Sequence, residues 1–105
     1  MEACIVITTC ARREEADQLA TEIVENRLAA CVQISEINST YTWEGKVAQE
    51  AEFKLVIKTR LDLYEALERW IKKHHSYDVP EIILVPVETG SADYLDWIEA
   101  VTETK

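Results

Sequence analysis

Residues 41–47 read Tyr41-Thr42-Trp43-Glu44-Gly45-Lys46-Val47 and lie between two stretches of extended chain. The returning stretch alternates, with apolar Phe53, Leu55 and Ile57 on one face and charged Glu52, Lys54 and Lys58 on the other. Successive side chains of a strand point to opposite faces, and Glu44-Gly45 suits a tight turn. Residues 30–59 are therefore predicted to form one long β-hairpin that turns near Trp43-Glu44-Gly45-Lys46.

The predicted arms each run to roughly a dozen residues, about twice the usual strand length. A domain of 105 residues cannot cover arms of that length, so the tip should project from it. Tyr41 and Trp43 would then expose apolar surface next to unpaired strand edges, which an identical subunit could cover. Oligomerisation follows as a hypothesis.

The remaining segments show the patterns of further strands and helices. The sequence predicts a buried strand over 3–9, an amphipathic helix over 13–27, a helix that ends near His74-His75, a strand over 81–85 and a last helix after Gly90-Ser91. Asp62 and Glu65 resemble a capping box at the start of the second helix. In the last helix Tyr94, Leu95, Ile98 and Val101 are expected to face inward.

This order of elements is β-α-β-β-α-β followed by a helix. It predicts the α+β class and a ferredoxin-like sandwich, in which helices cover one face of an antiparallel sheet. The length of the chain predicts a single domain over residues 1–105. Because this architecture supports many functions, it predicts none of them by itself.

The composition bears on partners and on location. The chain carries 20 acidic and 11 basic residues, a net charge of −9, which disfavours nucleic acid and anionic membranes as partners. It shows no signal-peptide pattern and no apolar stretch near 18 residues, so a cytoplasmic location is expected. Three cysteines without a C-x-x-C pair are expected to stay reduced.

His74-His75 is the most distinctive candidate for chemistry. Imidazole is the commonest transition-metal ligand and suits copper, zinc and nickel. Adjacent helical residues point about 100° apart, so the two rings can share one ion only where the helix unwinds, or with help from a second chain. In the alternative interpretation one histidine interacts with the C-terminal end of the helix dipole and the other is solvated.

The cysteines and carboxylates give weaker indications. Cys10 lies between the first strand and the first helix and is interpreted as a loop thiol, whereas Cys4 and Cys31 are interpreted as small apolar residues on strands. Carboxylates such as Glu44, Glu50, Glu52 and Glu81 match no catalytic spacing. The sequence holds no glycine-rich phosphate loop and no G-x-S-x-G or H-E-x-x-H motif. A non-enzymatic role is therefore predicted.

Several segments together resemble the CutA family of divalent-cation-tolerance proteins. They are Thr8-Thr9, Asn26-Arg27-Leu28-Ala29-Ala30-Cys31-Val32, Tyr41-Thr42-Trp43-Glu44-Gly45-Lys46-Val47, Ile57-Lys58-Thr59, His75-Ser76-Tyr77-Asp78-Val79-Pro80-Glu81-Ile82-Ile83 and Tyr94-Leu95-Asp96-Trp97-Ile98. The resemblance spans nearly the whole chain in order. It implies a tight homotrimer with interlocked hairpins, similar in outline to PII signalling proteins.

The resemblance also implies a function in the tolerance of divalent metals. Some family members bind copper through the histidine pair after the second helix and through a first-strand cysteine, which here implies His74 and His75 as ligands for copper or another divalent metal. This chain carries Thr8 where those members have cysteine, and Cys10 follows two residues later.

Two other functions are kept as hypotheses. One is a PII-like sensor that binds a small metabolite or anion between subunits, with Lys58, His75 and Tyr77 as polar candidates. The other is an enzyme with Cys31 or Cys10 as nucleophile and His75 as base.

Overall fold

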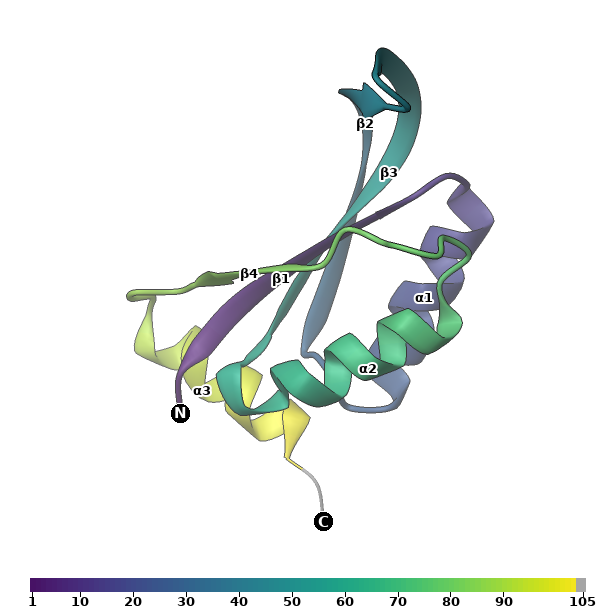
Figure 1. The fold of residues 1–105 in the computed structure, drawn as a ribbon. Helices are drawn as coiled ribbons and strands as arrows, with labels where there is room; N and C mark the ends of the chain where they lie inside the picture. The colour runs from purple at the N-terminus through teal and green to yellow at the C-terminus, as the bar shows by residue number, and fades with distance from the viewer. Residues whose placement is uncertain (104–105) are drawn as a thin grey trace.

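The computed structural model describes residues 1–103, so the last two residues of the predicted domain lie outside the described residues. Its elements are β1 (Ala3–Cys10), α1 (Arg13–Glu25), β2 (Cys31–Trp43), β3 (Lys46–Arg60), the short 3-10 helix η1 (Leu61–Leu63), α2 (Tyr64–His74), β4 (Ile83–Pro86) and α3 (Ala92–Thr102). Figure 1 shows them in this order along the chain. The predicted order of strands and helices and the α+β class are confirmed.

The four strands form one antiparallel sheet in the order β2-β3-β1-β4. β1 pairs with β3 along its whole length, from Ala3 opposite Arg60 to Cys10 opposite Phe53. It pairs on its other side with the short β4. β1 is therefore a central strand, as its apolar run predicts, and β2 and β4 are the edges.

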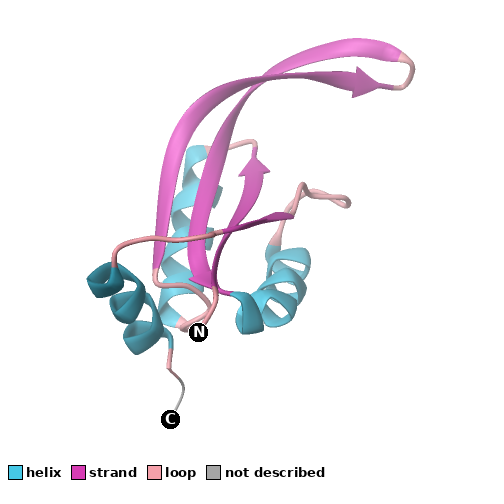
Figure 2. Ribbon diagram, turned by 90° about the vertical axis from the view of Figure 1, so that its left-hand side faces the viewer, coloured by secondary structure: helices cyan, strands magenta, loops and turns pink. Residues whose placement is uncertain are grey.

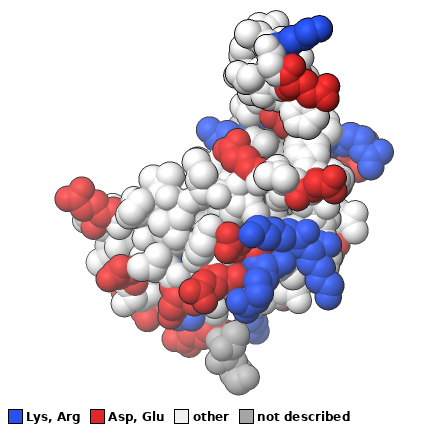
Figure 3. All heavy atoms as spheres, viewed as in Figure 1, with Lys and Arg blue, Asp and Glu red and all other residues white. Residues whose placement is uncertain are grey.

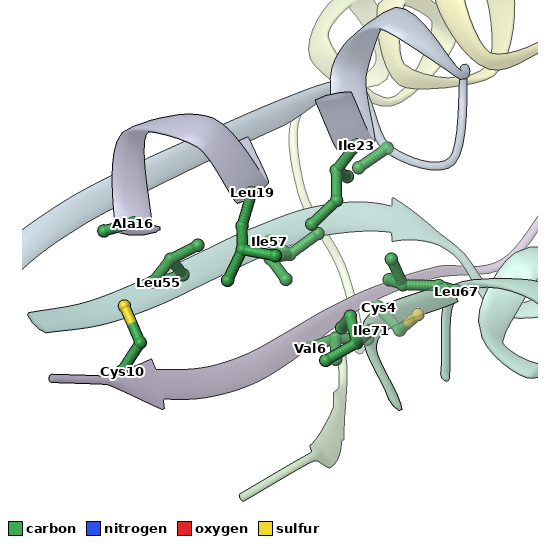
Figure 4. Packing of buried hydrophobic residues seen from close by; sticks show 11 residues of the cluster. Cys4, Val6, Cys10, Ala16, Leu19, Ile23, Leu55, Ile57, Leu67 and Ile71 are labelled. Carbon is green, nitrogen blue, oxygen red and sulfur yellow. The ribbon is translucent and has the colours of Figure 1, made fainter. Parts of the chain in front are cut away.

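The core lies between one face of this sheet and the helices α1 and α2. Figure 4 shows that apolar side chains from both layers meet there: Cys4, Val6 and Cys10 of β1, Leu55 and Ile57 of β3, Ala16, Leu19 and Ile23 of α1, and Leu67 and Ile71 of α2. Full burial of a large aliphatic side chain contributes roughly 1.5–3 kcal/mol. This packing fixes the ends of β1, α1 and α2 relative to one another.

The long hairpin of β2 and β3 is confirmed. The two strands stay in register from Cys31 opposite Lys58 to Trp43 opposite Lys46. Figure 2 shows the hairpin curving away from the other elements. At its tip Trp43 is 63% and Val47 76% exposed, and in Figure 3 uncharged atoms make up most of the surface there.

The turn at the tip consists of Glu44 and Gly45. Both have positive φ, 50° and 77°, as the type I′ hairpin turn requires. Glycine adopts this conformation without a steric penalty, whereas glutamate does not. The turn residues were predicted correctly, although Glu44 is a costly choice for the first position.

The start of α2 differs from the prediction. Asp62 lies in η1, where its carboxylate is 3.2 Å from Nε of Arg60, and the N-cap of α2 is Leu63 without a side-chain cap. The capping box predicted from Asp62 and Glu65 is therefore wrong. The chain leaves β3 through a 3-10 turn that places Asp62 before the cap position.

The last helix also differs in the side chains it buries. Ser91 caps α3, accepting a hydrogen bond from the Tyr94 backbone N–H, but Tyr94 and Val101 are exposed and only Ile98 and Thr102 are buried. The Tyr94 ring lies 5.5 Å from the Lys58 amino group. Since Lys58 alternates with core-facing Ile57, α3 meets the sheet face opposite α1 and α2.

None of the helices in residues 1–103 is both long enough and apolar enough to cross a membrane.

Candidate functional site

His75 connects three segments of the chain. It is the C-cap of α2, with extended backbone, and its side chain has no exposed surface. Nε2 lies 2.8 Å from the Thr9 carbonyl oxygen, and Nδ1 lies 3.0 Å from the Tyr77 backbone N–H. A carbonyl can only accept and an N–H can only donate, so these partners select the neutral ring protonated at Nε2. Both ring nitrogens are therefore occupied.

Two carboxylates support the same loop. Glu15 of α1 accepts hydrogen bonds from the backbone N–H and the hydroxyl of Ser76, at 2.9 and 2.8 Å. Glu52 of β3, which is only 8% exposed, accepts a hydrogen bond of 2.9 Å from the Tyr77 hydroxyl. Burial first, and then this acceptor, raise the pKa of Tyr77. The alternation predicts Glu52 on the strand face opposite Phe53 and Leu55, and the loop after α2 covers Glu52 there.

His74 lies in a different environment. It is the last residue of α2 and is exposed, and its ring stacks on Trp70 with centroids 4.1 Å apart. Nδ1 lies 2.8 Å from the Trp70 carbonyl oxygen, so Nδ1 carries the proton. In the neutral ring Nε2 is then a free acceptor, which is the form in which histidine binds metals.

The two histidines are adjacent in sequence, but their rings lie in different environments. The helix does end between them, as a shared ion would require, yet one ring binds the loop after α2 and the other stacks on α2. Among residues 1–103, His, Cys, Asp and Glu side chains form no group of three that could hold a metal ion. Within the part of the chain described, His74 alone presents an unoccupied imidazole nitrogen.

Two of the cysteines are buried thiols of the core. Burial raises the pKa of both Cys4 and Cys10 to about 11. Cys10 is the last residue of β1, and its Sγ lies 3.6 Å from the Arg12 carbonyl oxygen. The prediction of a loop thiol is wrong, because β1 extends one residue further than expected and carries Cys10 into the core.

Cys31 and Thr8 complete the set of side chains proposed from the sequence. Cys31 begins β2, is partly exposed and lies opposite Lys58 in the register. Thr8 is fully buried, and its hydroxyl has no hydrogen-bond partner among the described residues. A hydroxyl is a poor substitute for a soft thiolate as a copper ligand.

The residues of the sensor hypothesis are only partly together. His75 and Tyr77 have ring centroids 4.9 Å apart. Lys58 lies elsewhere, because its register partner on β1 is Ile5, whereas His75 bonds to Thr9 four residues further along that strand. Lys58 instead contacts Tyr94.

Sequence reasoning missed Glu15 and the buried role of Glu52. Glu15 is one of several acids in the first turns of α1, and no local pattern sets it apart from Glu14. Its partner Ser76 lies 61 residues away. The alternation in β3 assigns Glu52 to one face of the strand but gives no indication that Tyr77, 25 residues away, covers it.

Comparisons with a family model and with related proteins all point to the same family. The family model for the CutA1 divalent ion tolerance protein matches residues 4–101. "Protein CutA, chloroplastic" of Arabidopsis thaliana is 46% identical over 93% of this chain, and "Divalent-cation tolerance protein CutA" of Yersinia pestis is 40% identical over 93%. The chain spans about half of the Arabidopsis protein, 54%, and 83% of the Yersinia protein.

Solved structures agree with this result. CutA1 from Oryza sativa superposes with a TM-score of 0.96 at 42% identity, covering all of this chain and 97% of that one. The periplasmic divalent cation tolerance protein CutA from Archaeoglobus fulgidus gives 0.94 at 37% identity, covering 96% of this chain and 99% of that one.

The names of these relatives correct the predicted cytoplasmic location. The Arabidopsis protein and a further relative, "Protein CutA 1, chloroplastic" of Oryza sativa, are named chloroplastic, and the Archaeoglobus protein is named periplasmic. Related chains therefore occur in several compartments, and a missing signal pattern does not establish a cytoplasmic one. The cytoplasmic prediction is wrong.

The matched residues cover almost the whole described fold, including the hairpin, both histidines and α3. This chain is similar to these proteins in sequence, at 46% and 42% identity, and in three-dimensional structure. Identities this high indicate a shared family and not only a shared fold. This chain belongs to the CutA1 divalent ion tolerance protein family.

Proposed function

We propose that this chain acts in divalent-cation tolerance by binding a divalent metal ion, copper among them, through His74. The observation that carries the proposal is the hydrogen bond from Nδ1 of His74 to the Trp70 carbonyl oxygen. A metal-binding histidine almost always donates its other ring N–H to an oxygen, which fixes the tautomer and orients the ring. His74 has this arrangement before any metal arrives.

His75 supports this site in a different way. To bind a metal through Nδ1 it would have to release the Tyr77 N–H, and to bind through Nε2 it would have to release the Thr9 carbonyl. Either change leaves a partly buried polar group without a partner, at a cost of about 1 kcal/mol or more. His75 is therefore proposed as the residue that holds the loop after α2, and His74 as the metal ligand.

One imidazole from each chain makes a weak site. Thr8 offers only a hydroxyl in place of the cysteine that the resemblance implies. A tighter site needs further ligands, which another subunit or a carrier molecule would supply. The proposal therefore predicts reversible metal binding rather than a permanently bound cofactor.

A homotrimer is proposed as the assembled form. Its support is the exposed hairpin tip, where Trp43 and Val47 expose most of their surface, and the two sheet edges of β2 and β4. Natural proteins rarely leave long strand edges and apolar patches uncovered. Head-to-tail contacts between one end of a chain and the other end of the next close into rings.

The proposed role is non-enzymatic. With thiol pKa values of about 11, Cys4 and Cys10 carry almost no thiolate at neutral pH. The ring of His75 is occupied at both nitrogens and cannot accept a proton from a nucleophile without leaving its partners. The raised thiol pKa argues against Cys10 as nucleophile, and the occupied ring argues against His75 as base for either Cys10 or Cys31.

Calorimetric titration with Cu²⁺ and Zn²⁺ tests the proposal. The variant His74→Ala should lose most of the metal affinity, and Lys73→Ala, one residue before it on the same exposed helix end, should keep it. Equal affinities for wild type and His74→Ala would refute the ligand assignment.

A further inference from the structure

Trp70 contacts His74 in two separate ways. The two residues are four positions apart on α2, so their side chains lie on the same face of the helix. The Trp70 carbonyl oxygen lies 2.8 Å from Nδ1 of His74. The two aromatic rings also stack, with centroids 4.1 Å apart and an angle of 19° between their planes. The backbone and the side chain of one residue therefore hold the same imidazole ring.

The two rings of this stack are not held equally firmly. Trp70 is partly buried, packs against the core, and lines a shallow groove between α1 and α2 together with Leu19. His74 is exposed, and within residues 1–103 its side chain has no hydrogen-bond partner and no stacked ring other than those of Trp70. The indole is thus the anchored ring, and the imidazole takes its orientation from it.

The stack supplies a restraint that the hydrogen bond alone does not. On an exposed side chain, water competes for both partners of a single hydrogen bond. The imidazole would then turn away, and its proton would exchange between the two ring nitrogens. On the indole face a turned ring loses its aromatic contact. The stack therefore keeps Nδ1 beside the carbonyl oxygen and leaves Nε2 as the free nitrogen.

We propose that Trp70 is a positioning residue for the metal site, and the inference rests on the proposed metal binding by His74. A ligand that is already oriented loses little conformational freedom when the ion arrives. A metal ion also draws electron density from the imidazole, and a positively polarised group is attracted more strongly to an indole face than to a phenyl face. Metal affinity should therefore fall in the order Trp, Phe, Leu at position 70.

¹⁵N NMR of the metal-free protein tests the positioning by itself, because it reports which ring nitrogen carries the proton. The neutral His74 ring should be protonated at Nδ1 in wild type. Trp70→Leu keeps the backbone carbonyl and removes the stack, so it should shift the ring toward a mixture with the Nε2 form. Trp97→Leu is the matched control, at a tryptophan of α3 that pairs with Tyr94, and should leave the tautomer unchanged.

Calorimetry with Zn²⁺ measures the consequence for binding. Trp70→Leu should weaken the affinity roughly threefold to tenfold, the loss expected when one side chain has to be ordered on binding. Trp70→Phe should lie between wild type and Trp70→Leu, and Trp97→Leu should bind as wild type does.

Two results would overturn the inference. One is an unchanged His74 tautomer in Trp70→Leu, and the other is equal affinity for wild type and Trp70→Leu while His74→Ala loses the metal. If circular dichroism shows that Trp70→Leu loses helix, Trp70→Phe decides, and affinity equal to wild type then counts against the indole. Undiminished binding in His74→Ala would instead refute the proposed function, and the role of Trp70 in metal binding with it.

Discussion

Nε2 of His75 lies 2.8 Å from the carbonyl oxygen of Thr9, a residue 66 positions earlier in the chain. This bond joins the end of β1 to the loop after α2, and the Tyr77 N–H joins the other ring nitrogen to the same loop. A residue that the sequence indicates as a metal ligand therefore connects the end of α2, the end of β1 and the loop after α2.

His75→Ala should lower the free energy of unfolding by about 3 kcal/mol. The substitution leaves the Thr9 carbonyl and the Tyr77 N–H without partners and opens a cavity where a fully buried ring stood. Urea denaturation measures the effect. Ser76→Ala, which removes one hydroxyl of the same loop, is the control and should cost less. A loss below that of the control would show that the ring does not hold the loop.

A pair of substitutions at Arg27 separates backbone strain from side-chain contact. Arg27 follows α1 with φ of 57°, and its Nη1 donates to the Glu103 carbonyl oxygen at 2.8 Å. Both Arg27→Ala and Arg27→Gly lose that bond, but only glycine adopts this backbone without strain. Arg27→Gly should therefore be more stable than Arg27→Ala by about 1 kcal/mol.

Thermal unfolding of the two variants checks this difference. Equal melting temperatures would mean that the residue relaxes to another conformation once the contact with Glu103 is lost.

Much of the fold could be predicted from local patterns. The alternation in 46–60 and the pair Glu44-Gly45 predict the hairpin because both signals act between near neighbours. The burial of Glu52 and the hydrogen bond between His75 and Thr9 could not be predicted, since the partners of Glu52 and His75 lie 25 and 66 residues away. The sequence does contain the capping-box pattern of Asp62 and Glu65, but Asp62 does not cap α2, because the chain first makes a 3-10 turn.

Alkaline pH should destabilise the protein through Cys10. Burial raises the pKa of Cys10 in the folded chain to about 11, above the ordinary thiol value of 9.0, so the folded state keeps a proton that the unfolded state loses. The stability from this group is complete below pH 9 and is lost as pH rises toward 11.

Denaturant midpoints measured between pH 8 and about 11 follow this loss. Cys10→Ala should flatten the decline relative to wild type, and Cys31→Ala, at a thiol that is only partly buried, should not. Parallel curves for all three proteins would contradict the assignment.

Trp43→Ala should loosen the proposed trimer. Trp43 is 63% exposed in the single chain. Its truncation therefore removes little packing within the subunit but a large part of any contact that another subunit makes with the tip. Light scattering at decreasing protein concentration reports dissociation. Val24→Ala, at an exposed apolar residue of α1, is the control. An unchanged mass and melting temperature for Trp43→Ala would show that the tip is not covered.

Pulsed electron paramagnetic resonance of the Cu²⁺-loaded protein tests the central claim most directly, because it detects imidazole nitrogen bound near the metal. The proposed function predicts imidazole coupling in wild type and in Lys73→Ala, and its loss in His74→Ala. Persistence of the coupling in His74→Ala would contradict the claim and would indicate that His75, the other histidine of the chain, binds the metal.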